Sequence, residues 1–163
     1  MIRSKFVHGH MVCAAALLMI TLFAGGCGKP AANVERLLAD AKQERSSGKN
    51  SAAIINLKNI LQQSPDNAEA RYLLGATYYD MGDFRSAEAE LKRALDLRYD
   101  PAQVMPALGK ALLSMGEFQK VLDTTRIEGD VTNQVQAELL TLRAFALIGL
   151  RRTSEGRELL EQA

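Results

Sequence analysis

The sequence predicts an all-α fold in which one unit repeats and stacks into an α-solenoid. The first observation is the regular spacing of four glycines, Gly48, Gly82, Gly116 and Gly149, whose positions differ by 34, 34 and 33. The second is that the neighbouring residues also repeat, since "LLGATYYDMGDF" at 73–84 aligns with "ALGKALLSMGEF" at 107–118. Similarity at a period of about 20 to 50 residues is typical of solenoids built from one repeated unit.

The N-terminal segment has the three-part pattern of a bacterial export signal. Arg3 and Lys5 form a basic start, a short apolar stretch runs from Met11 to Ala24, and small residues follow it. A helix that spans a bilayer needs about 20 apolar residues, more than this stretch provides. The length therefore favours a signal peptide at residues 1–26, and an uncleaved anchor helix is the alternative.

The sequence "AGGC" at the end of the apolar stretch resembles the lipobox of bacterial lipoproteins, although Ala24 stands where a branched apolar residue is usual. The resemblance implies that Cys27 receives a diacylglycerol on sulfur and becomes the acylated N-terminus, with residues 27–33 as attachment site and spacer. Gly28 stands where an aspartate would retain a lipoprotein in the inner membrane. The resemblance therefore implies an outer-membrane anchor facing the periplasm, held firmly because several acyl chains insert together.

Removal of residues 1–26 takes away most residue types that catalyse reactions or bind metals. His8, His10 and Cys13 all lie in the signal, so the mature chain has neither histidine nor tryptophan. This excludes a histidine-dependent triad, a histidine-ligated metal and an intrachain disulfide. Lys and Arg fall from 20 to 18 against 19 Asp and Glu, a net charge of −1 that does not favour nucleic acid as a partner. We therefore expect no catalytic residue, no cofactor and no metal.

The repeated unit resembles the tetratricopeptide repeat, in which each unit is a pair of antiparallel helices. The resemblance implies that successive pairs stack into a right-handed α-solenoid. The unit at 68–101 matches best, through Leu74, Gly75, Tyr78, Gly82, Phe84, Ala87, Leu91, Ala94, Leu95 and Pro101. Arg71 stands where the family usually has an aromatic residue. The resemblance implies an array over 34–163 with units at about 34–67, 68–101, 102–134 and 135–163, the last of them incomplete.

Local signals place helix boundaries within these units. Asp66 with Glu69, and Asp100 with Pro101, are typical of helix starts. Gly82 suits the left-handed residue that ends a first helix. These signals predict first helices that begin near residues 68 and 102.

The flanking units depart from the pattern. In the first, "SAAIINLKNILQQSP" predicts a second helix that ends before Pro65. In the third, "DTTRIEGDVTNQ" loses register, which predicts a shortened second helix and an irregular turn near Gly129. Pro106 falls inside the predicted first helix of that unit, where it removes a main-chain donor and favours a kink. We expect "RELLEQA" at the end of the fourth unit to present an uncovered apolar face, as in a longer array.

The first helices of such units line a concave groove, and function in repeat arrays belongs to surfaces of this kind. Alignment places these residues in the groove: Glu35, Leu38, Lys42, Arg45, Glu69, Tyr72, Ala76, Tyr79, Gln103, Lys110, Leu113, Gln136, Leu139, Arg143 and Ala146. We predict that the binding residues are Lys42, Arg45, Tyr72, Tyr79, Lys110 and Arg143. Because cations outnumber Glu35 and Glu69, this surface suits an extended peptide or its terminal carboxylate. For each cation, a merely solvated position is the alternative.

The function class that these observations favour is a non-catalytic, lipid-anchored scaffold that binds other envelope proteins or peptides. The stretch "GKNSAAIINLKNILQQSPDNAEARYLLGATYYDMGDFRSAEAELKRAL", behind the lipobox, resembles the tetratricopeptide lipoproteins of PEP-CTERM/exosortase systems. That resemblance implies a role in protein sorting or exopolysaccharide production at the cell surface. Two alternatives stay open. They are a pilus-biogenesis tetratricopeptide lipoprotein, and the accessory repeats of an envelope enzyme whose catalytic part lies outside this chain.

Overall fold

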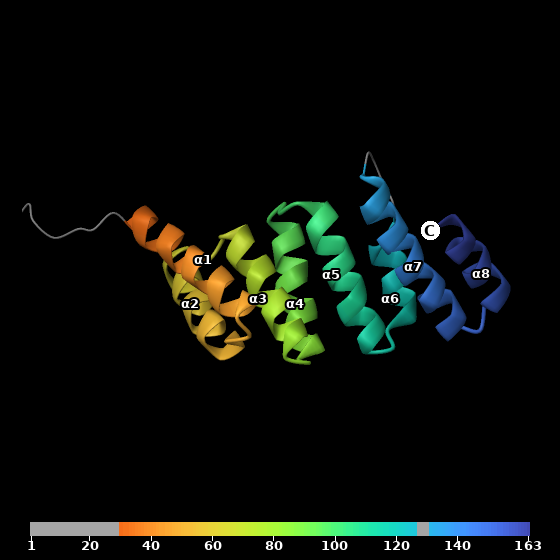
Figure 1. The fold of residues 1–163 in the computed structure, drawn as a ribbon, viewed down its shortest axis with the longest axis horizontal. Coiled ribbons are helices and arrows are strands. Elements are labelled where there is room, and N and C mark those ends of the chain that lie inside the picture. The colour runs from red at the N-terminus through yellow and green to blue at the C-terminus, as the bar shows by residue number, and fades with distance from the viewer. Residues whose placement is uncertain (1–29, 127–130) are drawn as a thin grey trace, which may run out of the picture. The chain divides into compact units, whose positions relative to one another are not determined.

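The computed structural model describes residues 30–126 and 131–163, and this part of the chain is helical without strands (Figure 1). The signal peptide and Cys27 lie outside the described residues, as does Gly129. The helices are α1 (Pro30–Ser46), α2 (Asn50–Gln63), α3 (Ala68–Asp80), α4 (Phe84–Asp96), α5 (Pro101–Ser114), α6 (Phe118–Thr124), α7 (Asn133–Gly149) and α8 (Thr153–Gln162).

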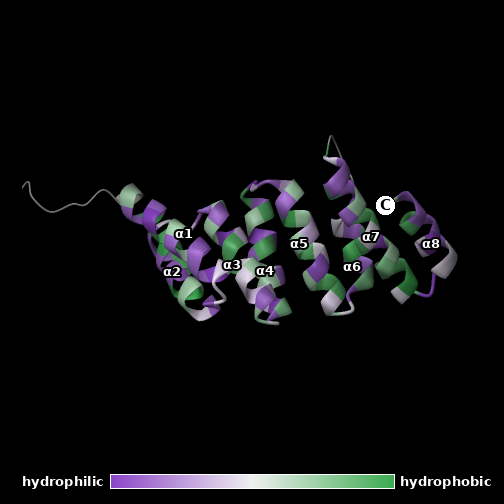
Figure 2. Ribbon diagram, in the orientation of Figure 1, coloured by the Kyte–Doolittle hydropathy of each residue, from purple (hydrophilic) through white to green (hydrophobic). Residues whose placement is uncertain are grey.

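The predicted helix pairs are confirmed within the unit formed by Val34–Ala163. Consecutive helices lie side by side as α1/α2, α3/α4, α5/α6 and α7/α8, and each pair packs on the next (Figure 1). Every helix carries both apolar and polar positions, as expected for helices that bury one stripe (Figure 2). The all-α solenoid predicted from the repeat period is therefore the observed architecture.

Left-handed residues end the first helix of each pair. Gly48, Gly82 and Gly116 have φ angles of 72°, 79° and 74°, as the spacing predicts. At the second of these turns, the main-chain N–H of Asp83 donates to the carbonyl of Tyr78, 3.0 Å away. Glycine is favoured because it adopts positive φ without the penalty that a Cβ brings.

The fourth pair uses a different residue for this turn. Gly149 is the last residue of α7, and the left-handed residue is Arg151, with φ 66°. The N–H of Arg152 donates to the carbonyl of Leu147 at 2.9 Å, which is the hydrogen bond seen at the glycine turns. Alignment at Gly149 is therefore out of register for α7 by two positions, because an arginine occupies the turn position where the other units have glycine.

Small residues allow the helices of a pair to approach closely. A Cβ added to Gly75 in α3 would lie 2.7 Å from Cγ of the buried Leu91 in α4. A Cβ added to Gly109 in α5 would lie 2.8 Å from Cγ2 of Thr125. Such distances are shorter than van der Waals contact, so larger side chains would force the helices apart. The repeated Leu-Gly dipeptide thus reflects close packing.

Arg71, which stands where the repeat usually has an aromatic residue, makes polar contacts instead. Its Nη1 donates to Glu90 of α4 at 2.7 Å, and its Nη2 donates to the carbonyl of Pro65 at 3.1 Å. The side chains of Arg71 and Glu90 are only 16% and 13% exposed. Glu90 also accepts from Arg93 at 3.1 Å. The arginine therefore joins α3 to α4 and to the turn before α3.

Helix starts and the short helix follow the local signals in most places. Asp100 caps α5 by accepting from the N–H of Ala102 at 3.0 Å, but α3 is capped by Asn67 and not by Asp66. Asn67 accepts from the N–H of Ala70, at the third position after it, which is the spacing that an N-cap requires. The second helix of the third pair, α6, has only 7 residues, as predicted. Helix α5 continues through Pro106.

Candidate functional site

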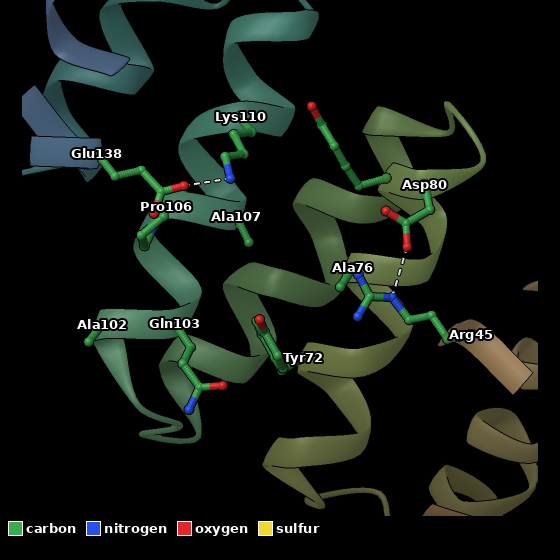
Figure 3. Close-up of a pocket in the computed structure, with 11 residues that line it drawn as sticks. Arg45, Tyr72, Ala76, Asp80, Ala102, Gln103, Pro106, Ala107, Lys110 and Glu138 are labelled. Atoms are coloured by element: carbon green, nitrogen blue, oxygen red, sulfur yellow. Dashed lines mark hydrogen bonds and ion pairs between the residues drawn. The ribbon is translucent and has the colours of Figure 1, made fainter. Parts of the chain in front are cut away.

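An open pocket of about 300 Å³ lies on the face formed by the first helices of the pairs (Figure 3). Its lining residues all come from odd-numbered helices: Arg45, Tyr72, Ala76, Tyr79, Asp80, Ala102, Gln103, Pro106, Ala107, Lys110 and Glu138. Helices α3 and α5 supply most of this wall. This arrangement is the groove that the repeat pattern predicts.

Two tyrosines of α3 face the pocket and are held by other rings. The ring of Tyr72 stacks on that of Tyr99, with centroids 5.0 Å apart and an angle of 22°. The ring of Tyr79 packs on Phe84 at 5.5 Å and 51°. Burial raises the pKa of the Tyr99 hydroxyl. The two tyrosines are therefore fixed by packing before any partner binds, which lowers the entropic cost of binding.

Ion pairs border the pocket on two sides. Nε of Arg45 lies 2.8 Å from Asp80, and Nζ of Lys110 lies 2.5 Å from Glu138 (Figure 3). Lys42, next to the pocket on α1, contacts Glu69 at 2.6 Å, and this hydrogen bond raises the pKa of Lys42. The sequence predicts an excess of positive charge here. The structure instead pairs each of these cations with a carboxylate.

Four of the six predicted binding residues line this pocket together: Arg45, Tyr72, Tyr79 and Lys110. Lys42 lies on the same helix as Arg45 but is not part of the wall. Arg143 lies elsewhere. Its Nη1 donates to the carbonyl of Leu122 at 2.8 Å and to that of Thr125 at 3.4 Å, at the end of α6.

The position of Arg143 follows from the register of α7. Leu139 and Ala146, also aligned to the groove, are buried with exposures of 1% and 0%. The turn residue Arg151 lies two positions beyond the aligned Gly149, so Glu138 takes the place that the alignment gave to Gln136. Glu138 is the residue that contacts Lys110.

Alignment of the small residues could have found this shift, because Ala144 follows Gly109 by the same separation as Arg151 follows Gly116. Ala144 is also a point of close approach, since its carbonyl oxygen lies against Gly156 of α8.

The sequence alignment missed the acidic members of the pocket. Asp80 and Glu138 were not among the predicted groove residues, yet each neutralises a predicted cation. Pro106, for which the sequence predicts only a kink, is buried in α5 and lines the pocket. The sequence signal for Glu138 is its separation from Glu69, which is close to two repeat lengths.

Metal-binding clusters and membrane-spanning helices are not found in the described part of the chain. Among the residues that the structure describes, no cluster of three or more His, Cys, Asp or Glu side chains could hold a metal ion. Within residues 30–126 and 131–163, no helix has the length and apolar character needed to cross a bilayer. The pocket between α3 and α5 is the candidate site because it brings together four of the six predicted binding residues.

Comparisons with known proteins agree with this architecture. Residues 44–108 match the tetratricopeptide repeat family model. No curated protein matches the sequence significantly. A crystal structure of MamA protein superimposes with a TM-score of 0.69 at 24% identity, covering 79% of this chain and 70% of that one. A second MamA crystal structure gives 0.68 at 26%, with 79% and 75% covered.

A larger protein contains a similar array. The structure of a K341M mutant of the O-GlcNAc transferase from Thermobaculum terrenum superimposes with a TM-score of 0.59 at 27% identity. The match covers 76% of this chain but only 27% of the transferase chain. The similarity thus extends over a minor part of the transferase. The family match is confined to residues 44–108, and the described residues adopt the tetratricopeptide-type solenoid fold.

Proposed function

We propose that this chain is a non-catalytic scaffold that binds other envelope proteins through the groove of its repeats. The observation that carries the proposal is the pocket between α3 and α5. Two packed tyrosines and two ion pairs converge there from four successive first helices. Arrays of this kind bind partners on the surface that their repeats share.

A lipid on Cys27 would hold this scaffold on the outer membrane, facing the periplasm. The support is the sequence "AGGC" after an apolar stretch too short to span a bilayer, with Gly28 in place of an inner-membrane retention signal. The proposed partners are therefore other envelope proteins. A chain anchored in this way needs no membrane-spanning helix of its own.

The pathway that we propose is exosortase-linked protein sorting or exopolysaccharide production. The support is the resemblance of the first two repeats, together with the lipobox, to tetratricopeptide lipoproteins of that system. An exosortase gene near the gene for this chain would support that assignment. A neighbourhood of pilus-assembly genes would replace it with the pilus-biogenesis alternative.

The scaffold proposal is tested by photocrosslinking in the native cell. A photoreactive amino acid replaces the exposed Gln103 in the pocket, and a matched variant carries it at the exposed Lys92 on α4, which does not line the pocket. We expect a discrete crosslinked envelope protein, identified by mass spectrometry, from position 103 only. Equal crosslinking from both positions, or none from 103, would refute binding through the groove.

A further inference from the structure

Two repeat interfaces are joined by the same kind of ion pair. Lys42 of α1 contacts Glu69 of α3 at 2.6 Å, and Lys110 of α5 contacts Glu138 of α7 at 2.5 Å. The two lysines are separated by two repeat lengths in the sequence. In both cases a lysine of one first helix reaches a glutamate in the first half of the next first helix. We call these two ion pairs the lysine–glutamate straps.

The interface between these two straps has no such pair. One repeat length after Lys42 the sequence has Ala76, and one repeat length after Glu69 it has Gln103. Both residues line the pocket between α3 and α5. The pocket therefore opens where a lysine and a glutamate would otherwise meet. The repeat is thus altered at this one interface, and a strap is present at each neighbouring interface, α1/α3 and α5/α7.

The surface left open by this departure combines small apolar side chains and two aromatic rings with polar groups at its edges. Ala76 and Ala107 present only methyl groups, so the rings of Tyr72 and Tyr79 form the largest apolar contact surfaces. The size of about 300 Å³ lies at the small end of ligand sites, which span about 300 to 1,000 Å³. It therefore suits one side chain with its adjoining main chain. A flat ring gains most here, because it can stack on a tyrosine held in place.

Hydrogen-bonding groups at the pocket suit a main chain in an extended form. Nε2 of Gln103 donates to Asp100 at 3.0 Å, and the amide oxygen of the same side chain is an acceptor. Figure 3 shows this oxygen on the side of the pocket that carries Tyr72. An extended peptide exposes main-chain N–H groups that can donate to such an oxygen. Extended, ring-bearing segments dock in aromatic grooves in this way in several unrelated folds.

The charges at the pocket disfavour an acidic partner. Arg45 already contacts Asp80, and Lys110 already contacts Glu138. An acidic peptide would have to displace a carboxylate from each cation, and its own carboxylates would be repelled by the displaced ones nearby. An uncharged segment leaves both ion pairs intact. Paired charges at the rim of a site thus select against charged ligands of either sign.

We propose that the pocket between α3 and α5 binds an extended, uncharged segment of another protein that presents a proline or aromatic ring to Tyr72 and Tyr79. The proposal rests on the proposed scaffold function and specifies the chemistry of its partner. The proposed ligand is uncharged, whereas a basic groove would favour a carboxylate. The missing strap at Ala76 and Gln103 supplies the space, and the two tyrosines supply the contact.

The test restores the missing strap. The double variant Ala76→Lys with Gln103→Glu recreates at this interface the pair seen at the two neighbouring ones. The matched control, Lys120→Ala with Glu88→Gln, removes an ion pair between the second helices α6 and α4, neither of which lines the pocket. The probes are three capped, fluorescein-labelled peptides of equal length: one of prolines and tyrosines, one with those prolines replaced by glutamates, and one of alanines and serines.

We expect the purified wild-type chain to bind the proline–tyrosine peptide most tightly in fluorescence anisotropy titrations. The strap variant should lose affinity for it by about tenfold or more, as when a central contact of an interface is removed. Its circular dichroism spectrum should stay unchanged, because the same pair is tolerated at two other interfaces. The control variant should bind this peptide as the wild type does.

Each of the following results would overturn the inference: equal binding by the strap variant, tighter binding of the glutamate peptide, or no preference for rings over alanine and serine. Absence of binding to all three peptides would overturn it as well. These failures differ from failure of the scaffold function. In that case crosslinking from position 103 in the cell would yield no partner, whatever the peptides do.

Discussion

Arg143 is expected to stabilise the fold and not to bind a partner. When units are aligned at their turns, Arg143 corresponds to Leu108, so an arginine occupies a position where the preceding unit has a buried leucine. Its guanidinium donates to the carbonyls of Leu122 and Thr125 at 2.8 and 3.4 Å. Helix α6 ends there after only 7 residues. The cation therefore satisfies carbonyls that an early helix end leaves without partners.

The substitution Arg143→Met isolates this contribution, because methionine keeps a long apolar stem and removes the charge and the donors. A hydrogen bond to a charged group contributes about 1.5 to 3 kcal/mol, and a cation at a helix C-terminus about 0.3 to 1 kcal/mol. The two overlap, so we expect a loss of about 2 kcal/mol in the free energy of unfolding. For a domain of this size that lowers the Tm by about 6 °C.

The assay is urea unfolding followed by circular dichroism, with amide hydrogen exchange to locate the change. The matched control is Arg157→Met on α8, where the arginine is exposed, and we expect it to change stability by less than about 0.5 kcal/mol. Exchange should quicken in α6 for the Arg143 variant only. A variant as stable as the wild type, with weakened binding of a groove ligand, would instead assign Arg143 to the binding surface.

Two further predictions concern the anchor and a helix cap. Cys27→Ser should abolish incorporation of labelled fatty acid and release the chain from membranes, whereas Cys13→Ser should not; retained labelling in the first variant would refute the lipobox. The hydroxyl and main-chain N–H of Ser86 donate to Asp83 and lower the pKa of that carboxyl. Its folded-state pKa is below the unfolded one, so its stabilisation is complete near pH 7 and lost as the pH falls through the folded-state pKa. Asp83→Asn, which keeps a capping oxygen, should therefore cost about 0.3 to 1 kcal/mol at about pH 7 and less at about pH 3 in urea titrations. A cost independent of pH would contradict this.

The fold was predictable because its signals are local and repeat. Glycine at positive φ marked the turns at Gly82 and Gly116, and Asp100 marked the start of α5. The same register brought Tyr72 and Tyr79 into the pocket. Each of these features depends on a residue type and its spacing, which a sequence displays directly.

The charge balance of the site was not predictable in the same way. Whether Asp80 reaches Arg45, and Glu138 reaches Lys110, depends on how far side chains extend between helices that are distant in sequence. The register of α7 was hidden because Arg151 adopts a backbone conformation that glycine usually signals. A non-glycine residue there costs about 1 to 2 kcal/mol and leaves no pattern in the sequence.

The ion pair between Arg71 and Glu90 makes the order in which these two residues could be replaced important for stability. Loss of Glu90 alone would leave the largely buried guanidinium of Arg71 without its carboxylate, a change that typically costs a few kcal/mol. Loss of Arg71 alone leaves Glu90 with a second cation, Arg93. A change to the aromatic residue that is usual at this position should therefore be tolerated better if Arg71 is replaced before Glu90 than in the opposite order.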